Sequence, residues 1–288
     1  MSNLQEPRLT DIAYVKQLMA RYGRHFDKRF GQNFLINPTV PRKIAEECGA
    51  PAECGILEIG PGIGTLTVEL AKRFAKVTAV ELDRGLIPIL GETLADYSNV
   101  EVVCADFLSL DLKIFVSEHF PGKEVAVCAN LPYYITTPVI MKLLESGVRF
   151  HSITIMVQRE VAARLSAKPA TPEYGAITAE VAWYCSVKKL FGVPASSFIP
   201  APKVESAVVR LEPHEPPSKV VTREEYRKVV TAAFAKRRKT ILNALSAGRD
   251  KEEVARRLNE AGIEPERRGE TLSPEEFAAV ALALRGIL

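Results

Sequence analysis

Residues 57–67 constrain the fold of this chain of 288 residues more than any other stretch. An apolar run ends there in glycines at alternate positions, Gly60, Gly62 and Gly64, and a helical pattern of apolar residues follows. This order predicts a strand, a tight turn and a helix, a unit that places a nucleotide-like ligand at the carboxyl end of a parallel strand. Glycines in such a turn allow positive φ values and a close approach to the ligand.

The spacing of these glycines argues against a dinucleotide. The dinucleotide fingerprint is G-x-G-x-x-G, with helix-start amides directed at a pyrophosphate. Here Thr65 fills the third glycine position, and Pro61 removes one backbone amide. Glu81 ends the next apolar run, where a carboxylate can bind a ribose diol. We therefore expect an adenosyl ligand without phosphates, S-adenosylmethionine. The alternatives are a structural glycine turn and an ordinary dinucleotide site.

Short apolar runs alternate with helical patterns from residue 55 to about residue 160. Continuous apolar runs between helices indicate parallel strands covered on both faces. Glu58, Glu81, Asp106 and Asn130 stand at or just past the carboxyl ends of four runs, the edge where such sheets bind ligands. Asp106 is positioned to accept from an adenine amino group or simply to form an Asx turn. The predicted strands are 56–59, 77–81, 100–103, 124–129 and 152–157, and the predicted helices are 65–73, 84–95, 112–118 and 137–146.

The tetrapeptide Asn130-Leu131-Pro132-Tyr133 has the chemistry needed to methylate an aromatic amine. Such an amine is a poor nucleophile because its lone pair is delocalised into the ring. The Asn130 side-chain oxygen and the Leu131 carbonyl can accept its hydrogens. Pro132 fixes the turn, and Tyr133 offers a stacking face for the base. The rate would come from holding the amine in line with a methyl sulfonium. An ordinary loop is the alternative.

Cations and aromatic side chains alternate in residues 21–30. A surface that grips unpaired nucleic acid uses cations for phosphates and rings for bases. On this basis Arg24, Lys28 and Arg29 are predicted RNA contacts, with a solvated basic surface as the alternative.

Residues 213–218 form the clearest linker, and the chain beyond it has helical patterns throughout. Capping boxes are expected where Thr222 precedes Glu225 and where Ser273 precedes Glu276. Between residues 223 and 239, seven Lys or Arg face two Glu, so the local charge is 7 − 2 = +5, more than the +3 of the whole chain. A solvated charge run is one explanation, and a clamp on looped or duplex RNA is the other. The predicted RNA-binding residues there are Lys236, Arg237, Arg238 and Lys239.

Several classes of protein are disfavoured by composition. No apolar run approaches the roughly 20 residues that span a bilayer, and the first residues lack a signal-peptide pattern. Five scattered cysteines without a C-x-x-C pair predict reduced thiols in the cytoplasm. Four dispersed histidines argue against a metal site. We expect a cytoplasmic monomer with no metal and no DNA or membrane partner.

Four motifs in order resemble the bacterial ribosomal RNA adenine N6,N6-dimethyltransferases, which modify two adjacent adenines near the 3′ end of small-subunit rRNA. The resemblance extends from about residue 10 to the C-terminus. It implies a Rossmann-like class I methyltransferase fold, whose seven-stranded sheet is mostly parallel with an antiparallel last strand. It also implies a catalytic domain at 1–214, led by helices and a motif in 1–54, and an all-α RNA-binding domain at 219–288. The motifs are Gly31-Gln32-Asn33-Phe34-Leu35, Glu58-Ile59-Gly60-Pro61-Gly62, Asn130-Leu131-Pro132-Tyr133 and residues 198–211.

The resemblance assigns a donor site for S-adenosylmethionine. It implies that Asn33 and Leu35 contact the donor from the N-terminal segment. Gly60 is assigned to the methionine end, Glu81 to the ribose and Asp106 to the adenine. Asn130 is expected to serve both the donor and the target amine.

The target site and the function follow from the same resemblance. Tyr133 and Phe198 are expected to sandwich a flipped adenine. The implied activity is dimethylation of N6 of two adjacent adenosines in 16S rRNA, within a pre-30S particle, during ribosome biogenesis. Two alternatives stay open: a large-subunit adenine methylase of the macrolide-resistance type, and a non-catalytic RNA-binding or assembly factor. The basic helical tail with residues 267–273 favours the small-subunit enzyme.

Overall fold

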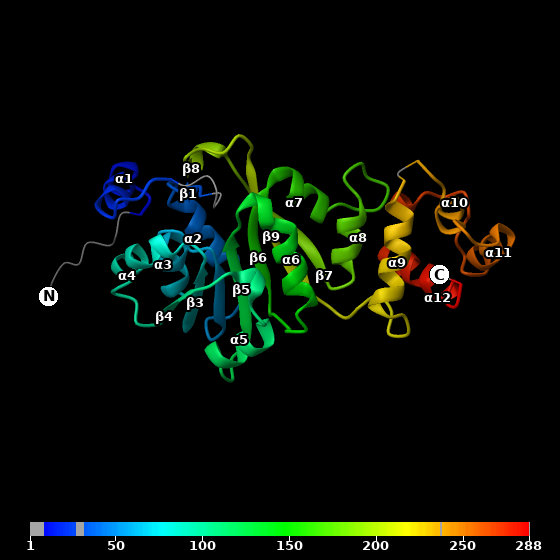
Figure 1. The fold of residues 1–288 in the computed structure, drawn as a ribbon, viewed down its shortest axis with the longest axis horizontal. Helices are drawn as coiled ribbons and strands as arrows, with labels where there is room; N and C mark the ends of the chain where they lie inside the picture. The colour runs from blue at the N-terminus through cyan, green and yellow to red at the C-terminus, as the bar shows by residue number, and fades with distance from the viewer. Residues whose placement is uncertain (1–8, 27–31, 237, 288) are drawn as a thin grey trace. The chain divides into compact units, whose positions relative to one another are not determined.

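A seven-stranded sheet forms the centre of the first part of the chain (Figure 1). The computed structural model describes residues 9–26, 32–236 and 238–287. The sheet has the order β4-β3-β2-β5-β6-β9-β7, and its strands from β4 to β6 pair in parallel, while β9 is antiparallel to β6. The predicted fold class is confirmed. The strands are β2 (Gly55–Ile59), β3 (Lys76–Glu81), β4 (Val100–Cys104), β5 (Val125–Asn130), β6 (Ile153–Gln158), β7 (Cys185–Val193) and β9 (Ser206–Pro213).

The register of the sheet brings the carboxyl ends of its parallel strands to one edge. Glu58 pairs with Ala79 of β3 and with Cys128 of β5, and Glu81 pairs with Cys104 of β4. Every residue of β2 is buried, as expected for a central strand with both faces covered. The polar residues that follow the strands therefore share one edge.

Amphipathic helices cover the sheet. On one face, α2 (Thr39–Glu46) and α3 (Thr65–Ala71) bury apolar side chains against β2, β5 and β6 in a single core. A second core joins α1 (Ile12–Arg21) to α4 (Ile87–Thr93), and Arg21 forms an ion pair of 2.6 Å with Glu92 at its rim. The remaining helices of the first 165 residues are α5 (Leu112–His119), α6 (Thr136–Glu145) and α7 (Arg159–Leu165).

A two-stranded antiparallel sheet was not predicted from the sequence. It joins β1 (Phe34–Leu35) to β8 (Phe198–Ile199), with Leu35 opposite Phe198. Ile36 N also donates to Ser197 O at 2.8 Å. The N-terminal motif is thus held at the sheet edge by a segment from much later in the chain.

The last part of the chain is helical and has a core of its own. Tyr226 and Phe277 are fully buried in this core, and the Tyr226 hydroxyl donates to Ala179 O at 2.9 Å. Both predicted capping boxes are present, at Thr222 and at Ser273. The helices of this part are α8 (Ala176–Ala182), α9 (Arg223–Phe234), α10 (Ile241–Leu245), α11 (Lys251–Glu260) and α12 (Pro274–Ala283).

The chain divides into two compact units whose boundaries differ from those predicted. The first comprises residues 1–162 and 188–213, and the second comprises residues 163–187 and 214–288. The predicted division after residue 214 left α8 in the first domain. The structure places α8 in the second unit, because Tyr174, Ala179 and Trp183 pack into the helical core. None of the described helices combines the length and apolar character needed to cross a bilayer.

Candidate functional site

A hollow of about 710 Å³ lies where β2, β3 and β5 end. Its volume includes space open to solvent. The glycine turn after β2, the N-terminal motif that contains β1 and the turn after β5 all contribute to its lining. The hollow therefore brings together three of the four motifs. The predicted site residues that line it are Asn33, Leu35, Gly60, Glu81, Asn130, Leu131, Pro132 and Tyr133.

The glycine turn has the positive φ values that its sequence predicts. Gly60 has φ +69°, and a Cβ added there would meet no atom within 4 Å, so its backbone faces open space. Gly62 has φ +63°, and a Cβ there would lie 2.9 Å from the ring of Phe34. A side chain at Gly60 would project into space that a ligand can use, whereas one at Gly62 would displace the N-terminal motif.

Glu81 connects the end of β3 to the glycine turn. One carboxylate oxygen accepts from Gly62 N at 3.1 Å, and the other accepts from Asp83 N at 2.8 Å. Burial raises the pKa of Glu81, while these two backbone hydrogen bonds oppose the rise. Each oxygen retains a further lone pair for a ligand hydroxyl. This geometry suits the predicted role at a ribose diol.

A second carboxyl group, Glu58, lies beneath the same turn. It is 1% exposed, and its Oε2 finds no hydrogen-bond partner among the described residues. Burial raises the pKa of Glu58 from 4.5 to about 8, and the nearby Glu81 contributes. The buried Thr65 hydroxyl likewise finds no partner within the described chain. Unpartnered buried polar groups are costly, so these two atoms indicate a ligand or water that completes the site.

The charges of the lining select between ligands. Glu58 and Glu81 lie on the hollow, and the described lining contains no Lys, Arg or His. A pyrophosphate would meet two carboxyl groups and no cation. A ligand with sulfonium and ammonium groups would instead gain from both carboxylates. The lining thus fits S-adenosylmethionine better than a dinucleotide.

The turn after β5 is fixed at both ends. The Asn130 side-chain amide donates to Asn33 O at 3.4 Å, which assigns its Oδ1 to an acceptor role. Leu131 N donates to Met156 O at 3.3 Å. The Tyr133 hydroxyl hydrogen-bonds the Ser206 hydroxyl at 2.7 Å, and burial raises the pKa of Tyr133, so this phenol stays neutral. The amide and the aromatic ring therefore have defined positions at the mouth of the hollow.

A second hollow of about 460 Å³ adjoins the first. Its walls include Asp106 and the apolar side chains of Phe107 and Leu108. Asp106 Oδ1 accepts from Leu108 N at 2.9 Å, so the Asx-type turn considered as the simpler explanation is present. Because Asp106 also faces an apolar slot, the turn and a contact with a purine ring are compatible. The residues that line both hollows are Gly60, Glu81 and Pro132.

Phe198 does not line either hollow. Its side chain is 3% exposed and belongs to the core that contains Leu35 and Val193. The pairing of β8 with β1 causes this burial. In this conformation the ring is not available to stack on a base, so its placement does not support the predicted adenine sandwich with Tyr133.

Arg24, a predicted RNA contact, has an acidic partner in the structure. Its guanidinium forms an ion pair of 2.5 Å with Asp83, a residue whose side chain is only 6% exposed. Gln32 donates to the same carboxylate at 2.9 Å. Arg24 therefore ties the segment after α1 to the end of β3, and its role as an RNA contact stays a prediction. Lys28 and Arg29 lie outside the described residues.

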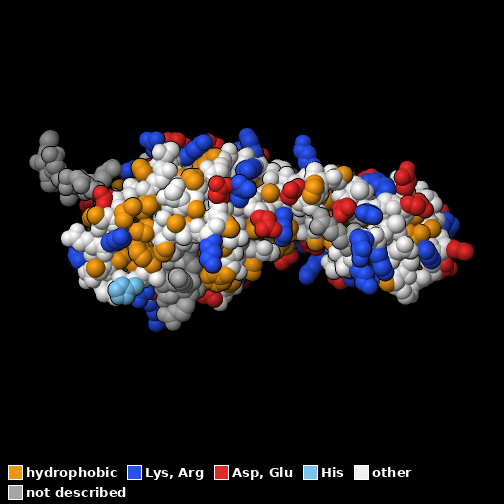
Figure 2. Space-filling view, turned by 90° about the horizontal axis from the view of Figure 1, so that it is seen from above, with side chains coloured by type: hydrophobic (Ala, Val, Ile, Leu, Met, Phe, Trp, Pro, Cys, Tyr) orange, Lys and Arg blue, Asp and Glu red, His pale blue; other side chains and the backbone are white. Residues whose placement is uncertain are grey.

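The cations that follow α9 are exposed. Lys236, Arg238 and Lys239 face solvent and take part in none of the ion pairs among the described residues, while Arg237 lies outside them. Figure 2 shows Lys and Arg side chains gathered on one face of the helical unit. The sequence prediction of an accessible basic cluster fits this placement.

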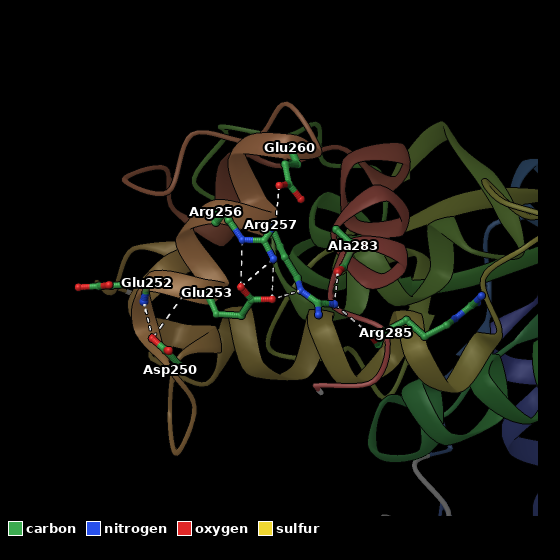
Figure 3. A network of polar contacts seen from close by, with 8 residues as sticks. All are labelled: Asp250, Glu252, Glu253, Arg256, Arg257, Glu260, Ala283 and Arg285. Atoms are coloured by element: carbon green, nitrogen blue, oxygen red, sulfur yellow. Dashed lines mark hydrogen bonds and ion pairs between the residues drawn. The ribbon is translucent and has the colours of Figure 1, made fainter.

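Other arginines of the helical unit have acidic partners. In α11, Arg256 and Arg257 both contact Glu253, and Arg256 also reaches Glu260 at 2.5 Å (Figure 3). Arg257 additionally donates to Ala283 O at 3.0 Å. Arg257 thus holds α11 against the end of α12, and Arg256 is neutralised within α11. The cations after α9 are therefore better placed for an anionic ligand.

Sequence reasoning did not assign several lining residues. Phe34 and Gln32 belong to a quoted motif but received no role, and Glu58 was noted only for its position after a strand. Gln32 and Phe34 reach the hollow because the N-terminal motif lies over the glycine turn. That arrangement depends on tertiary contacts, so no local sequence pattern indicates it. The unassigned lining residues are Gln32, Phe34, Glu58, Pro61, Gly62, Thr65, Leu66 and Leu86.

Comparison with known proteins gives consistent matches over nearly the whole chain. The profile of the family "Ribosomal RNA adenine dimethylase" matches residues 23–285. "Ribosomal RNA small subunit methyltransferase A" of Bacillus mycoides is 48% identical over 277 residues, covering 94% of this chain and 95% of the relative. The protein of the same name from Alkaliphilus metalliredigens is 47% identical over 277 residues, covering 95% and 96%.

Two solved structures share this architecture. A dimethyladenosine transferase from Plasmodium falciparum superposes with a TM-score of 0.75 at 27% identity, covering 87% of this chain and 96% of that one. The 23S rRNA methyltransferase ErmE gives a TM-score of 0.69 at 29% identity, covering 88% and 99%.

Proposed function

The chain belongs to the ribosomal RNA adenine dimethylase family, and from this premise we propose that it transfers methyl groups from S-adenosylmethionine to N6 of two adjacent adenosines near the 3′ end of 16S rRNA. It is therefore an enzyme of rRNA methylation. Family membership establishes the class of enzyme, and the proposal specifies the methyl donor, the ribosomal subunit and the position of the target adenosines.

The main structural support for this proposal is that the glycine turn and the Asn130–Tyr133 turn line one hollow. A donor held by the first turn would present its methyl group to a base held by the second. The Asn130 amide also contacts the N-terminal motif directly, at Asn33 O. Donor and target contacts are thus parts of one hydrogen-bonded arrangement.

The residues present fit S-adenosylmethionine. Bound there, it would supply an electrophilic methyl group on a positively charged sulfur. Gly60 leaves space for the methionine end, and Glu81 is placed for the ribose. Asp106, Phe107 and Leu108 border an apolar slot for the adenine. Glu58, whose Oε2 finds no hydrogen-bond partner among the described residues, would become negatively charged by losing its proton when a sulfonium or ammonium group binds.

The turn after β5 acts on the target amine. Asn130 Oδ1 and the Leu131 carbonyl accept the two amine hydrogens, which draws the nitrogen lone pair out of conjugation with the ring. Tyr133 provides the stacking face. No strong base is needed, because the methylated nitrogen releases its proton readily to water. Most of the rate enhancement comes from holding the nitrogen in line at near-attack distance. No step requires a metal.

The helical unit supplies affinity for rRNA. Lys236, Arg238 and Lys239 are exposed and lack acidic partners among the described residues, so they are suited to phosphate contacts. Recognition of backbone shape suits a structured loop in a pre-30S particle. We propose that a monomer acts on this particle in the cytoplasm, with no DNA partner.

A large-subunit methylase is the alternative with structural support, because ErmE shares the architecture. The sequence favours the small-subunit enzyme. Identity to the small-subunit methyltransferases is 47–48% over nearly full length, against 29% to ErmE.

The test is to incubate the protein and S-adenosylmethionine with 30S and 50S particles from a strain that lacks both marks, and to locate the products by mass spectrometry. We expect N6,N6-dimethyladenosine at two adjacent positions in 16S rRNA only. Asn130→Ala should abolish the product. Asn259→Ala changes the same residue type at an exposed site on α11 and should leave activity intact.

Three results would contradict the proposal in different ways. Modification of 23S rRNA alone would identify the large-subunit enzyme. No modification, with tight binding to 30S particles, would identify a non-catalytic factor. Full activity of Asn130→Ala would leave the reaction but remove the proposed site.

A further inference from the structure

We propose that Cys54, Glu124 and His151 form a binding site for a single zinc ion, at the edge of the sheet opposite the donor hollow. The Cys54 Sγ, a Glu124 carboxylate oxygen and a His151 ring nitrogen all lie within 4.8 Å of one another. Among the described residues this is the only such group of three. The inference is independent of the methyltransferase reaction.

The sheet positions all three side chains. Each immediately or closely precedes a strand: Cys54 before β2, Glu124 before β5 and His151 before β6. These strands are neighbours in the sheet, and β5 and β6 lie side by side in Figure 1. Main-chain bonds fix the three starts, because Gly55 N donates to Glu124 O at 2.9 Å and His151 N donates to Val125 O at 2.8 Å. The donor set is therefore preorganised by rigid backbone.

Both ring nitrogens of His151 face acceptor atoms. Its Nε2 lies 3.1 Å from Gly49 O, and a carbonyl only accepts, so Nε2 carries the proton. In the neutral ring Nδ1 is then an acceptor, yet it faces a Glu124 carboxylate oxygen at 3.2 Å. Two acceptors at this distance require a positive charge between them. Either a second proton or a metal ion supplies it.

The third ligand favours the metal. The Cys54 thiol would not strengthen a proton-bridged pair of His151 and Glu124, whereas a Cys54 thiolate would be a strong zinc ligand. Thiolate sulfur, imidazole nitrogen and carboxylate oxygen are each ligands that zinc accepts, and water would take the fourth position. The bond from His151 Nε2 to a carbonyl is the outer-shell contact that zinc-bound histidines commonly make.

The site is open to ions and distant from the donor. Cys54 is 2% exposed, but the Glu124 side chain is 75% exposed and that of His151 is 35% exposed, so zinc can enter from solvent. A bound ion would join the starts of three strands and, through the His151 hydrogen bond to Gly49 O, the loop that follows α2. Zinc binding is therefore expected to stabilise the first unit.

The test uses the full chain, stripped of metal by a chelator and titrated with zinc alone by isothermal calorimetry. We expect saturation near one equivalent and a rise in melting temperature. Cobalt as a probe should give a thiolate charge-transfer band. His151→Asn and Cys54→Ser should each weaken zinc binding by more than about 100-fold, beyond the 10–100-fold typical of outer-shell changes.

Matched variants control for residue type. Cys104→Ser removes an exposed thiol elsewhere, and His119→Asn removes the histidine that contacts Glu101 at 2.9 Å without a cysteine. Both should bind zinc as the unaltered protein does. Circular dichroism of the metal-free variants checks folding. If Cys54→Ser unfolds, the zinc affinity of His151→Asn, a change at a partly exposed position, tests the proposal.

Two results would overturn the proposal. One is the absence of saturable zinc binding to the unaltered chain. The other is zinc binding that His151→Asn and Cys54→Ser leave unchanged.

Discussion

Glu81 accepts a hydrogen bond of 3.1 Å from the backbone nitrogen of Gly62. This bond joins the end of β3 to the middle of the glycine turn and leaves lone pairs on the carboxylate for a ligand. The residue proposed to bind the ribose thus also sets the shape of the loop proposed to bind the methionine end. Changes at Glu81 should consequently affect the affinity of the whole donor.

Glu81→Gln should weaken donor binding more than it weakens the fold. The amide has one acceptor oxygen, but both Glu81 oxygens accept from backbone N–H groups, so one such bond is lost. A hydrogen bond from a ligand hydroxyl to a charged acceptor contributes about 1.5–3 kcal/mol, so losing the ribose bond should raise the Kd of S-adenosylhomocysteine about 10–100-fold by calorimetry. Glu118→Gln, at an exposed site on α5, should change nothing. An unchanged Kd for Glu81→Gln would disprove the ribose assignment.

Gly60→Ala should abolish or strongly reduce donor binding at a modest cost in stability. Gly122 has the same φ of +69° and equally open surroundings, but lies in the turn after α5. Gly60→Ala and Gly122→Ala should therefore both destabilise by about 1–2 kcal/mol, from the left-handed backbone alone. Only Gly60→Ala should lose affinity for S-adenosylhomocysteine. Equal donor affinity in both variants would show that Gly60 does not border the donor.

The buried Glu58 predicts a specific pH dependence. Its pKa in the folded protein, about 8, exceeds the ordinary 4.5, so the native state holds the proton more tightly than the unfolded chain. Stability from this group is complete below pH 4.5 and is lost as pH rises toward 8. A cationic donor favours the carboxylate, so donor binding should release a proton at neutral pH. Urea melts and calorimetry in buffers of different ionisation enthalpy measure the two effects, and both should flatten in Glu58→Gln. Identical pH profiles for the two proteins would remove Glu58 from the donor site.

Replacing Lys236, Arg238 and Lys239 together by Ala should weaken rRNA binding in a salt-dependent way. Loss of three phosphate contacts should reduce the slope of log Kobs against log salt by about 2–3. The free energy of unfolding should stay nearly constant, because the three side chains are exposed. Arg256→Ala is the control, since Glu253 and Glu260 already neutralise that cation. A salt slope that the triple variant does not alter would place the RNA contacts elsewhere.

Features that depend on neighbouring residues could be predicted from the sequence, whereas contacts between distant segments could not. The strands before Gly60 and Asn130 and the helix cap at Thr222 depend on neighbouring residues, and each forms as predicted. The pairing of β1 with β8 depends on segments far apart in the chain. No periodicity indicates that Phe198 will be covered by Leu35.

Charge patterns show the same limit. The basic cluster after α9 is exposed as predicted, whereas Arg24, from an equally basic run, pairs with Asp83. Asp83 is 59 residues from Arg24 in the sequence, so no local pattern indicates this pair. The proposed zinc site could not be predicted from the sequence for the same reason. Cys54, Glu124 and His151 are scattered in sequence and meet only because β2, β5 and β6 are adjacent.

The two-residue pairing of β1 with β8 also has a consequence for the order in which a growing polypeptide matures. Phe34 emerges from the ribosome early, but its partner strand starts at residue 198. A nascent chain therefore contains both turns of the hollow before β1 can pair with β8. A fragment that stops short of residue 198 would contain nearly all the proposed donor contacts and still lack that pairing, so donor affinity should develop late in translation.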